Sequence, residues 1–219
     1  MHHFIILPTF GLEVHVALML YVAVGLIVFS LLLKNKLRLV PGKLQSVVEL
    51  TVETFVNLSE EVMGHKGRKF VPFILTFFIF ILAANVLALI PGLMPPTANL
   101  NITLGLALIV FVTTHIVGIK EHGLGYIKHF TGPMWYLAPL MIPIEIFGHL
   151  ARPVSLSMRL FGNMMGHELL IGVLLLLMPY AYPLLAFVTV LGVIVVVLQA
   201  LIFALLAMAY IGGALEEAH

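Results

Sequence analysis

The sequence contains no cysteine and few charged residues. Among its 219 residues, 11 are Lys or Arg and 10 are Asp or Glu, so charged side chains make up 10% of the chain. The lack of cysteine excludes disulfides and thiolate metal sites. The scarcity of charge excludes a soluble domain, which would need many more charges to cover its surface. The net charge of +1 and the lack of a basic tail give no indication of nucleic-acid binding.

Hydrophobic residues dominate instead. They make up 62% of the chain, and the mean hydropathy is +1.16. The apolar runs are long and continuous, whereas the strands of a membrane barrel alternate apolar and polar residues. The sequence therefore predicts an all-α integral membrane protein. No Lys or Arg precedes the first apolar run, so we do not expect a cleaved signal peptide.

Five segments within a single membrane domain, residues 1–219, are predicted to cross the bilayer. They are spans at about 14–33, 70–91 and 102–119, a long helix at 134–177 and a final helix at 184–211. As one helix the fourth segment would be roughly 67 Å long, against a hydrocarbon core of about 30 Å. It must be strongly tilted, kinked at Pro139, Pro143 or Pro153, or partly outside the membrane. We expect the last two helices to form a long, strongly tilted hairpin.

Residues 44–63 form a different kind of segment, which is too polar to cross a bilayer. Its apolar residues favour one side of a helix and its glutamates largely another; these are Val48, Val52, Phe55, Val56 and Val62, against Glu49, Glu53, Glu60 and Glu61. We therefore expect an amphipathic helix on the cytoplasmic side, lying on the membrane surface or against a partner.

The basic residues predict the orientation of the chain. Nine of the eleven fall on the same side of a five-span arrangement, namely Lys34, Lys36, Arg38, Lys43, Lys66, Arg68, Lys69, Lys120 and Lys128. Loops rich in Lys and Arg face the cytoplasm, so the N-terminus is expected outside and the C-terminus in the cytoplasm. The two remaining basic residues, Arg152 and Arg159, lie within the long fourth segment.

The fourth segment carries a polar stripe. At 100° per residue, six polar side chains fall within about 80° of one another; they are Glu145, His149, Arg152, Arg159, Asn163 and His167. Ser155 lies just off the edge of the stripe, and Glu168 points about 100° away from His167. Pro153 can bend this helix, so the angles are approximate.

Arg159 is the residue most difficult to accommodate in a membrane. A guanidinium keeps its charge at every physiological pH, and a charge at mid-membrane costs about 2.5–3.5 kcal/mol or more. Neither Glu145 nor Glu168 stands three or four residues from Arg159. A carboxylate on another subunit is therefore an attractive partner, the alternative being a buried arginine that only holds helices together.

Other polar residues near Arg159 can carry ions. His167 and Glu168 can exchange protons, and Asn163 and Ser155 can hold water. Gln199, in the final segment, is expected to face the protein interior and the fourth segment. The alternative for His167 is a hydrogen-bonded histidine of the core, and the alternative for Gln199 is a simple hydrogen bond between helices.

Two stretches carry a resemblance to a known family. "SLSMRLFGNMMGHEL" at 155–169 and "LQALIFALLAMAYIGGALEEAH" at 198–219 closely resemble subunit a of the membrane sector of bacterial F-type ATP synthases, most specifically at "RLFGN" and "LQA.IF". "NVLALIPG" at 85–92 also looks like the second span of that family. The resemblance extends over the whole chain, because that family also has five spans, an outside N-terminus, a surface helix after the first span and a long tilted hairpin at the end.

The resemblance implies a role for each residue. Arg159 corresponds to the essential arginine of the family, which faces a carboxylate on the ring of c subunits. The positions that map to the outer half-channel or the surroundings of the arginine are Asn163, His167, Glu168 and Gln199. Glu145 and Ser155 map to the cytoplasmic side of the path, and the stripe adds His149. Some members have a histidine where this chain has Gly192, so the relay is expected to rest on His167 and Glu168.

The implied function is that of a stator, not catalytic by itself. Two offset half-channels would carry protons to and from the c-ring carboxylates and so couple ion flow to ring rotation and ATP synthesis. The implied partners are the c-ring, the peripheral stalk subunit b, the remainder of the ATP synthase and the lipid bilayer. The location would be the bacterial inner membrane, with no cofactor, metal or nucleic acid.

Two other classes of protein remain as alternatives. A membrane-embedded metalloenzyme would need a ligand cluster, but "GHELLIG" has Ile171 where the H-E-x-x-H motif has its second histidine. His115, His122 and His129 recur every seven residues, but Gly123 and Gly125 break that helix, so we interpret them as loop and interface histidines. An independent ion-coupled carrier would need a substrate site, which nothing here resembles.

Overall fold

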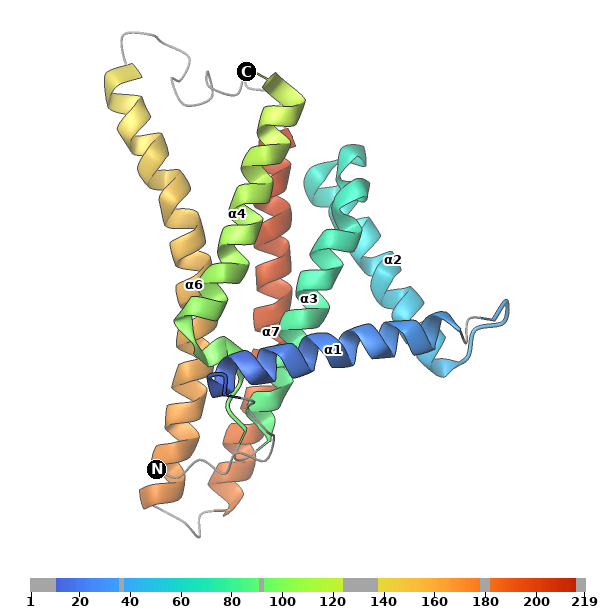
Figure 1. Cartoon of the computed structure of the whole chain (residues 1–219), viewed down its shortest axis with the longest axis vertical. Coiled ribbons are helices and arrows are strands. Elements are labelled where there is room, and N and C mark those ends of the chain that lie inside the picture. Colours follow the sequence, from blue (N-terminus) through green and yellow to red (C-terminus); the bar gives the residue numbers. More distant parts are fainter. Residues whose placement is uncertain (1–10, 36–37, 91–92, 124–137, 178–181, 216–219) are drawn as a thin grey trace.

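The computed structural model describes residues 11–35, 38–90, 93–123, 138–177 and 182–215 (Figure 1). Across these residues the secondary structure is helical, without strands, which confirms the predicted all-α fold. The α-helices are α1 (Val14–Lys34), α2 (Lys43–Met63), α3 (Val71–Val86), α4 (Leu100–His122), α6 (Ala138–Leu177) and α7 (Tyr182–Leu215). Three short 3-10 helices are η1 (His65–Phe70), η2 (Leu87–Leu89) and η3 (Pro96–Ala98).

Five helical segments are long and apolar enough to cross a bilayer. They are α1, the run from η1 through α3 to η2, α4, α6 and α7. The amphipathic helix α2 is not among them. Segments 134–137 and 91, which the sequence assigns to spans, lie outside the described residues.

Glycines end two of the helices. Gly64 follows α2 with a φ of +67°, and Gly123 follows α4 with a φ of +56°. Backbone in this left-handed region is readily adopted by glycine, so the chain can leave the helix there without steric cost. The predicted break at Gly123 is confirmed. At its other end, α4 is capped by Asn99, whose side-chain oxygen accepts a hydrogen bond from the N–H of Asn101 at 2.9 Å.

The core forms where α3, α4, α6 and α7 lie together (Figure 1). Its fully buried side chains come from all four helices and include Ile81, Val110, Leu160 and Phe203. The buried face of α7 is rich in small residues, including Ala200, Ala204, Ala207 and Gly212. Small side chains let helix backbones approach closely, which is a common way for helices to pack in membranes. The core therefore fixes α6 against α4 and α7.

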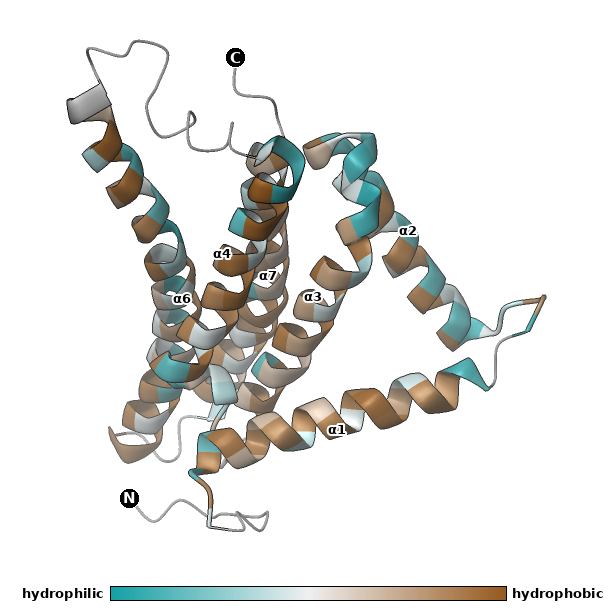
Figure 2. Ribbon diagram, turned by 45° about the horizontal axis from the view of Figure 1, so that its top comes forward, coloured by the Kyte–Doolittle hydropathy of each residue, from teal (hydrophilic) through white to brown (hydrophobic). Residues whose placement is uncertain are grey.

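The first helix contacts this core near its own start, through Met19, and is largely exposed beyond it. Figure 2 shows that α1 is hydrophobic on nearly all sides, and its axis lies at a steep angle to the axes of α6 and α7 (Figure 1). Ala17 and Leu18 are its buried residues, and His15 donates a hydrogen bond to the carbonyl of Pro95 at 3.4 Å. Helix α1 is about 32 Å long and α6 about 60 Å, at 1.5 Å per residue. The length of α1 matches a bilayer core of about 30 Å, so an upright α1 requires a strongly tilted α6–α7 hairpin.

Helix α2 packs through a narrow stripe. Phe55, Ser59 and Met63 are buried, one turn apart from each other, and contact α7 and α3. Val52 and Val62, which the sequence places on the apolar face, are 36% and 38% exposed, because the neighbours of α2 cover only the single line of residues that meets them. Contact of this apolar face with a membrane surface or a partner stays a prediction.

Charged residues gather at one end of the helices. In η1, Lys66 pairs with Glu121 of α4, and Arg68 lies 3.9 Å from Glu60 of α2. The C-terminal end of α4, the beginning of α6 and the last turns of α7 lie at this same end (Figure 1). We refer to it below as the basic end.

Candidate functional site

Helix α6 carries most of the predicted site residues. It is continuous from Ala138 to Leu177, although it contains Pro143 and Pro153. Its buried side chains recur at helical spacing and form the face that packs on the core; they are His149, Pro153, Leu156, Ser157, Leu160 and Met164. The opposite faces of α6 are exposed, so this helix is packed on one side only.

Arg159 lies near the middle of α6 and is half-buried. Among the ion pairs found in the described part of the chain, none involves Arg159, and neither Glu145 nor Glu168 reaches it. Ser155 and Asn163, one turn before and one turn after Arg159, are exposed. Gly162 and Gly166 continue this face, and the space in front of both is open. Arg159 therefore stands beside a face of small and polar residues that other helices of this chain leave uncovered.

His167 lies two turns further along α6 and packs directly on α7. A methyl group at Gly192 would lie 3.0 Å from Cε1 and 3.2 Å from Cδ2 of His167. The Nε2 atom of His167 is buried and has no hydrogen-bond partner among the residues described. Glu168 is half-buried beside it in the sequence. The absence of a side chain at position 192 thus creates the space that the imidazole occupies.

The contact between His167 and Gly192 also determines the level at which Gln199 lies. The helices α6 and α7 run antiparallel as a hairpin (Figure 1), and Gln199 lies two turns beyond Gly192 on the buried face of α7. His167 faces Gly192, and Arg159 lies eight residues before His167 whereas Gln199 lies seven residues after Gly192. Because the helices are antiparallel, Arg159 and Gln199 differ in level by only about 1.5 Å along the hairpin. Gln199 is 8% exposed, which confirms that it faces the interior.

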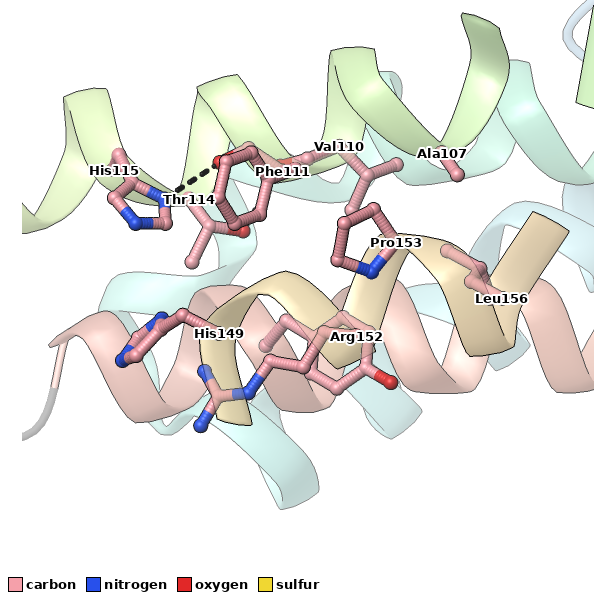
Figure 3. A pocket seen from close by; sticks show the side chains of 10 residues that line it. Ala107, Val110, Phe111, Thr114, His115, His149, Arg152, Pro153 and Leu156 are labelled. Carbon is pink, nitrogen blue, oxygen red and sulfur yellow. Dashed lines mark hydrogen bonds between the residues drawn. The ribbon is translucent and has the colours of Figure 1, made fainter. Parts of the chain in front are cut away.

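A second group of polar residues lies closer to the basic end. A cavity of about 10 Å³ is lined by residues of α4, α6 and α7, including His115, His149, Arg152 and Tyr210 (Figure 3). Nε2 of His149 lies 3.7 Å from Oε2 of Glu145. The guanidinium of Arg152 lies over the ring of Tyr210, 5.5 Å from its centre. This contact is a cation–π interaction and fixes Arg152 against α7.

The structure separates the predicted polar residues of α6 into three parts. Glu145, His149 and Arg152 lie toward the basic end, Ser155, Arg159 and Asn163 lie at the half-open middle, and His167 lies against Gly192. Sequence reasoning missed two residues of the cavity, His115 and Tyr210. The interpretation of His115 as a loop or interface histidine was wrong, because it lies within α4 and lines this cavity. The spacing between residues of α4 and α6 is set by packing, so no local pattern could reveal it.

His122 does not line this cavity. His122 lies in the last turn of α4, and His129 lies outside the described residues. Within the described ranges, no three His, Asp or Glu side chains are placed to hold a metal ion together.

These features define a class: a multi-pass helical membrane protein with a line of ionisable side chains on one long helix. The chain belongs to the ATP synthase A chain family, whose sequence profile matches residues 16–212. It is 51% identical over 213 residues to ATP synthase subunit a 1 of Syntrophotalea carbinolica, a match that covers 97% of this chain and 90% of that protein.

Other bacterial relatives are equally similar. ATP synthase subunit a of Trichlorobacter lovleyi is 52% identical over 198 residues, covering 90% of this chain and 85% of that protein. The subunit a of Geobacter sulfurreducens is 51% identical over 198 residues, with 90% and 86% covered. The family assignment predicted from "RLFGN" and "LQA.IF" is confirmed.

Proposed function

We propose that this chain is subunit a, the ion-conducting stator subunit of a bacterial F-type ATP synthase. The single observation that carries the proposal is the position of Arg159. It is a permanent cation within a helix apolar enough to cross a membrane, and it is half-buried without an ion pair among the described residues. No carboxylate of the described residues supplies its counter-charge, which favours a carboxylate on another subunit.

A ring of c subunits, each with one membrane-embedded carboxylate, would supply that counter-charge. An ionised carboxylate cannot enter lipid without prohibitive cost, so it must be neutral there. Opposite Arg159 it can be charged, because the guanidinium stabilises the carboxylate and favours loss of its proton. The uncovered face with Ser155, Asn163, Gly162 and Gly166 supports this docking, since small side chains allow a neighbouring helix to approach.

Two offset half-channels would connect this contact to the two sides of the membrane. On one side of Arg159, His167, Glu168 and Asn163 would form the outer path together with Gln199 of α7. On the other side, Ser155, His149 and Glu145 would form the cytoplasmic path. Along α6, His167 is about 12 Å and His149 about 15 Å from Arg159, and this separation on opposite sides supports two paths.

The offset would make ion flow and rotation interdependent. A proton entering by one path would neutralise a ring carboxylate, which could then move into lipid. It would leave by the other path only after the ring had carried it almost a full turn. Arg159 would block direct passage between the two paths. A membrane potential supplies about 2.3 kcal/mol per charge for each 100 mV, and rotation would pass this energy to ATP synthesis elsewhere in the complex.

The orientation follows from the basic end. Lys66, Arg68 and Lys120 lie there, and loops rich in such residues face the cytoplasm. We infer that the N-terminus lies outside and that the C-terminus and α2 lie on the cytoplasmic side of the bacterial inner membrane. The peripheral stalk subunit b and the remainder of the ATP synthase would be further partners, and ATP chemistry would occur on other subunits.

The test is Arg159→Ala in the assembled complex, reconstituted in lipid vesicles. We expect ATP-driven proton pumping to be abolished while the variant still inserts and assembles. Arg68→Ala is the matched control, because Arg68 has a side chain that is 71% exposed. Pumping by Arg159→Ala at the rate of the control would overturn the proposed function.

A further inference from the structure

His115 of α4 and His149 of α6 approach each other at the cavity near the basic end. Their ring centres are 5.3 Å apart and their planes are inclined by 72°. Figure 3 shows the two imidazoles extending from facing helices beside the same cavity. His149 is 8% exposed and His115 is half-buried. Two titratable rings thus meet at an interface that is otherwise largely apolar.

The hydrogen bond of His115 defines which of its nitrogens is basic. Nδ1 lies 2.9 Å from the carbonyl oxygen of Phe111. A carbonyl can only accept, so Nδ1 must carry a hydrogen and Nε2 is the atom that gains or loses a proton. The ring is therefore held in one tautomer by its own helix.

Glu145 connects His149 to solvent. The side chain of Glu145 is 39% exposed, and that of His149 is 10% exposed. The 3.7 Å between Nε2 and Oε2 exceeds a direct hydrogen bond, whose limit is about 3.2 Å. A small side-chain movement or one bridging water would close this gap. Glu145, His149 and His115 thus form a series that runs from the surface into the protein.

The cavity offers room and acceptors for water. Its volume of about 10 Å³ is close to the minimum of roughly 10–15 Å³ that one water requires. Pro153 has no N–H, so it cannot donate the usual helical hydrogen bond to the carbonyl of His149. Thr114 also lines the cavity, and its hydroxyl donates to the carbonyl of Val110 at 2.9 Å, which leaves oxygen lone pairs as acceptors.

Charged groups of both signs lie near the two histidines. From α6, the Glu145 carboxylate lies beside His149, and the Arg152 guanidinium lines the same cavity. From α7, Tyr210 lies against Arg152 and lines the cavity. From α4, the nearest charged groups along the helix are Lys120 and Glu121, more than one turn beyond His115.

We propose that His115 and His149 are a proton-transfer pair within the cytoplasmic half-channel, an inference that rests on the proposed function. A proton leaving the ring carboxylate reaches the cavity through water and binds Nε2 of His115 or the free-base nitrogen of His149. A proton bound at Nε2 of His115 leaves from the same atom and passes to His149. A protonated His149 then releases one proton to the Glu145 carboxylate. Glu145 then releases the proton to solvent, so one proton enters and one leaves.

The experiment uses the assembled complex in lipid vesicles with His115→Gln, His149→Gln and His149→Ala. Passive proton flow through the membrane sector is driven by a potassium diffusion potential after the water-soluble head has been removed, and it is measured across a range of pH on the cytoplasmic side. His65→Gln is the matched control, because His65 is an exposed histidine of η1 at the same end.

We expect each glutamine variant to conduct about a hundredfold less than the control, the lower end of what a positioned proton-transfer group contributes. The pH profile of the remaining flow is expected to change shape. In His149→Ala, added imidazole restores flow, whereas pyrazole, which has the same shape but is a far weaker base, does not. If His149→Gln fails to assemble with the ring, the proposal is tested with His115→Gln, which lies on the other helix. The loss of proton flow and the change in its pH profile then decide.

Two results would overturn the pair. One is flow at the control rate in both glutamine variants at every pH. The other is a loss that leaves the pH profile unchanged and that imidazole does not rescue, as a packing role predicts. If Arg159→Ala is inactive while the histidine variants conduct normally, the pair is refuted and the stator function stands. Normal pumping by Arg159→Ala refutes the function on which the pair depends.

Discussion

The imidazole of His167 occupies the space left by the missing side chain of Gly192. Its ring atoms would stand 3.0–3.2 Å from a methyl group at that position, with Nε2 closer still. Nε2 is buried, and no hydrogen bond to it is found in the described portion of the chain. A titratable ring is thus held between α6 and α7 by the shape of α7, two turns from Arg159 on one helix and two turns from Gln199 on the other.

Gly192→Ala is expected to displace His167. A Cβ atom cannot be accommodated at the present distances, so the ring must rotate or α7 must shift. Overpacking of this kind costs about 1–3 kcal/mol, and we expect ATP-driven proton pumping to fall by about tenfold as the proton carrier loses its position. Gly213→Ala, also on α7, is the matched control because the space around it is open.

A double variant separates the steric effect from other effects. If the overlap with His167 is the cause, Gly192→Ala has little further effect in a His167→Ala background. An equal loss in both backgrounds would contradict the steric explanation. The measurement is the pumping rate of the four combinations at fixed pH, compared as a double-mutant cycle.

Glu168→Gln is expected to slow proton pumping more than Glu145→Gln. Glu168 is half-buried next to His167, where few waters can replace a carboxylate. The Glu145 side chain is 39% exposed, so solvent can take over part of its role. We expect the two rates to differ by about tenfold. Initial rates of ATP-driven acidification in vesicles measure this, and equal rates would remove the ranking.

Thr97→Val is expected to destabilise the fold. The hydroxyl of Thr97 donates to Oδ1 of Asn85 at 2.6 Å, and both residues are 0% exposed. Without the hydroxyl, the buried amide of Asn85 loses this partner, at a cost of about 1–3 kcal/mol. The midpoint of thermal unfolding in detergent measures the effect. Thr113→Val is the control, because Thr113 bonds only to the carbonyl of Ile109 in its own helix. Equal midpoints for the two variants would contradict the prediction.

Gly67→Ala is expected to disturb the turn between α2 and α3. A Cβ atom at position 67 would come within 2.5 Å of Cβ of Met63 and 2.8 Å of the carbonyl oxygen of Ser59. Relief of this overlap moves η1 away from α2, which costs about 1–3 kcal/mol. Gly105→Ala, in open space on α4, removes a flexible residue from a helix and is expected to stabilise by up to about 1 kcal/mol. Thermal unfolding of both variants tests these opposite signs, and a stabilised Gly67→Ala would refute the first.

Composition and periodicity were sufficient for the broad architecture. Continuous apolar runs in place of alternation predict membrane helices, because every backbone group must be bonded within its own segment in lipid. The polarity of residues 44–63 identifies α2 as a helix that does not cross, and Gly123 ends α4 through a φ that glycine adopts readily. These properties are local, so they can be read from neighbouring residues.

The sequence was less informative about which faces become buried. The apolar face assigned to α2 included Val52 and Val62, which remain exposed, whereas Ser59 is fully buried. Hydrophobicity identifies residues that tolerate lipid as well as residues that pack, and in a membrane protein these are not the same. Burial on α2 is decided by where η1, α3 and α7 approach it.

By itself the sequence determined a helical membrane protein with Arg159 in the middle of a polar stripe, because charge, hydropathy and helical spacing are properties of one segment. Only the tertiary structure decided that His167 fits against Gly192, that Gln199 lies near the level of Arg159, and that His115 meets His149 beside a cavity. Such contacts join helices that are far apart in sequence. They depend on the register and distance at which backbones pack, and no spacing within one helix encodes these quantities.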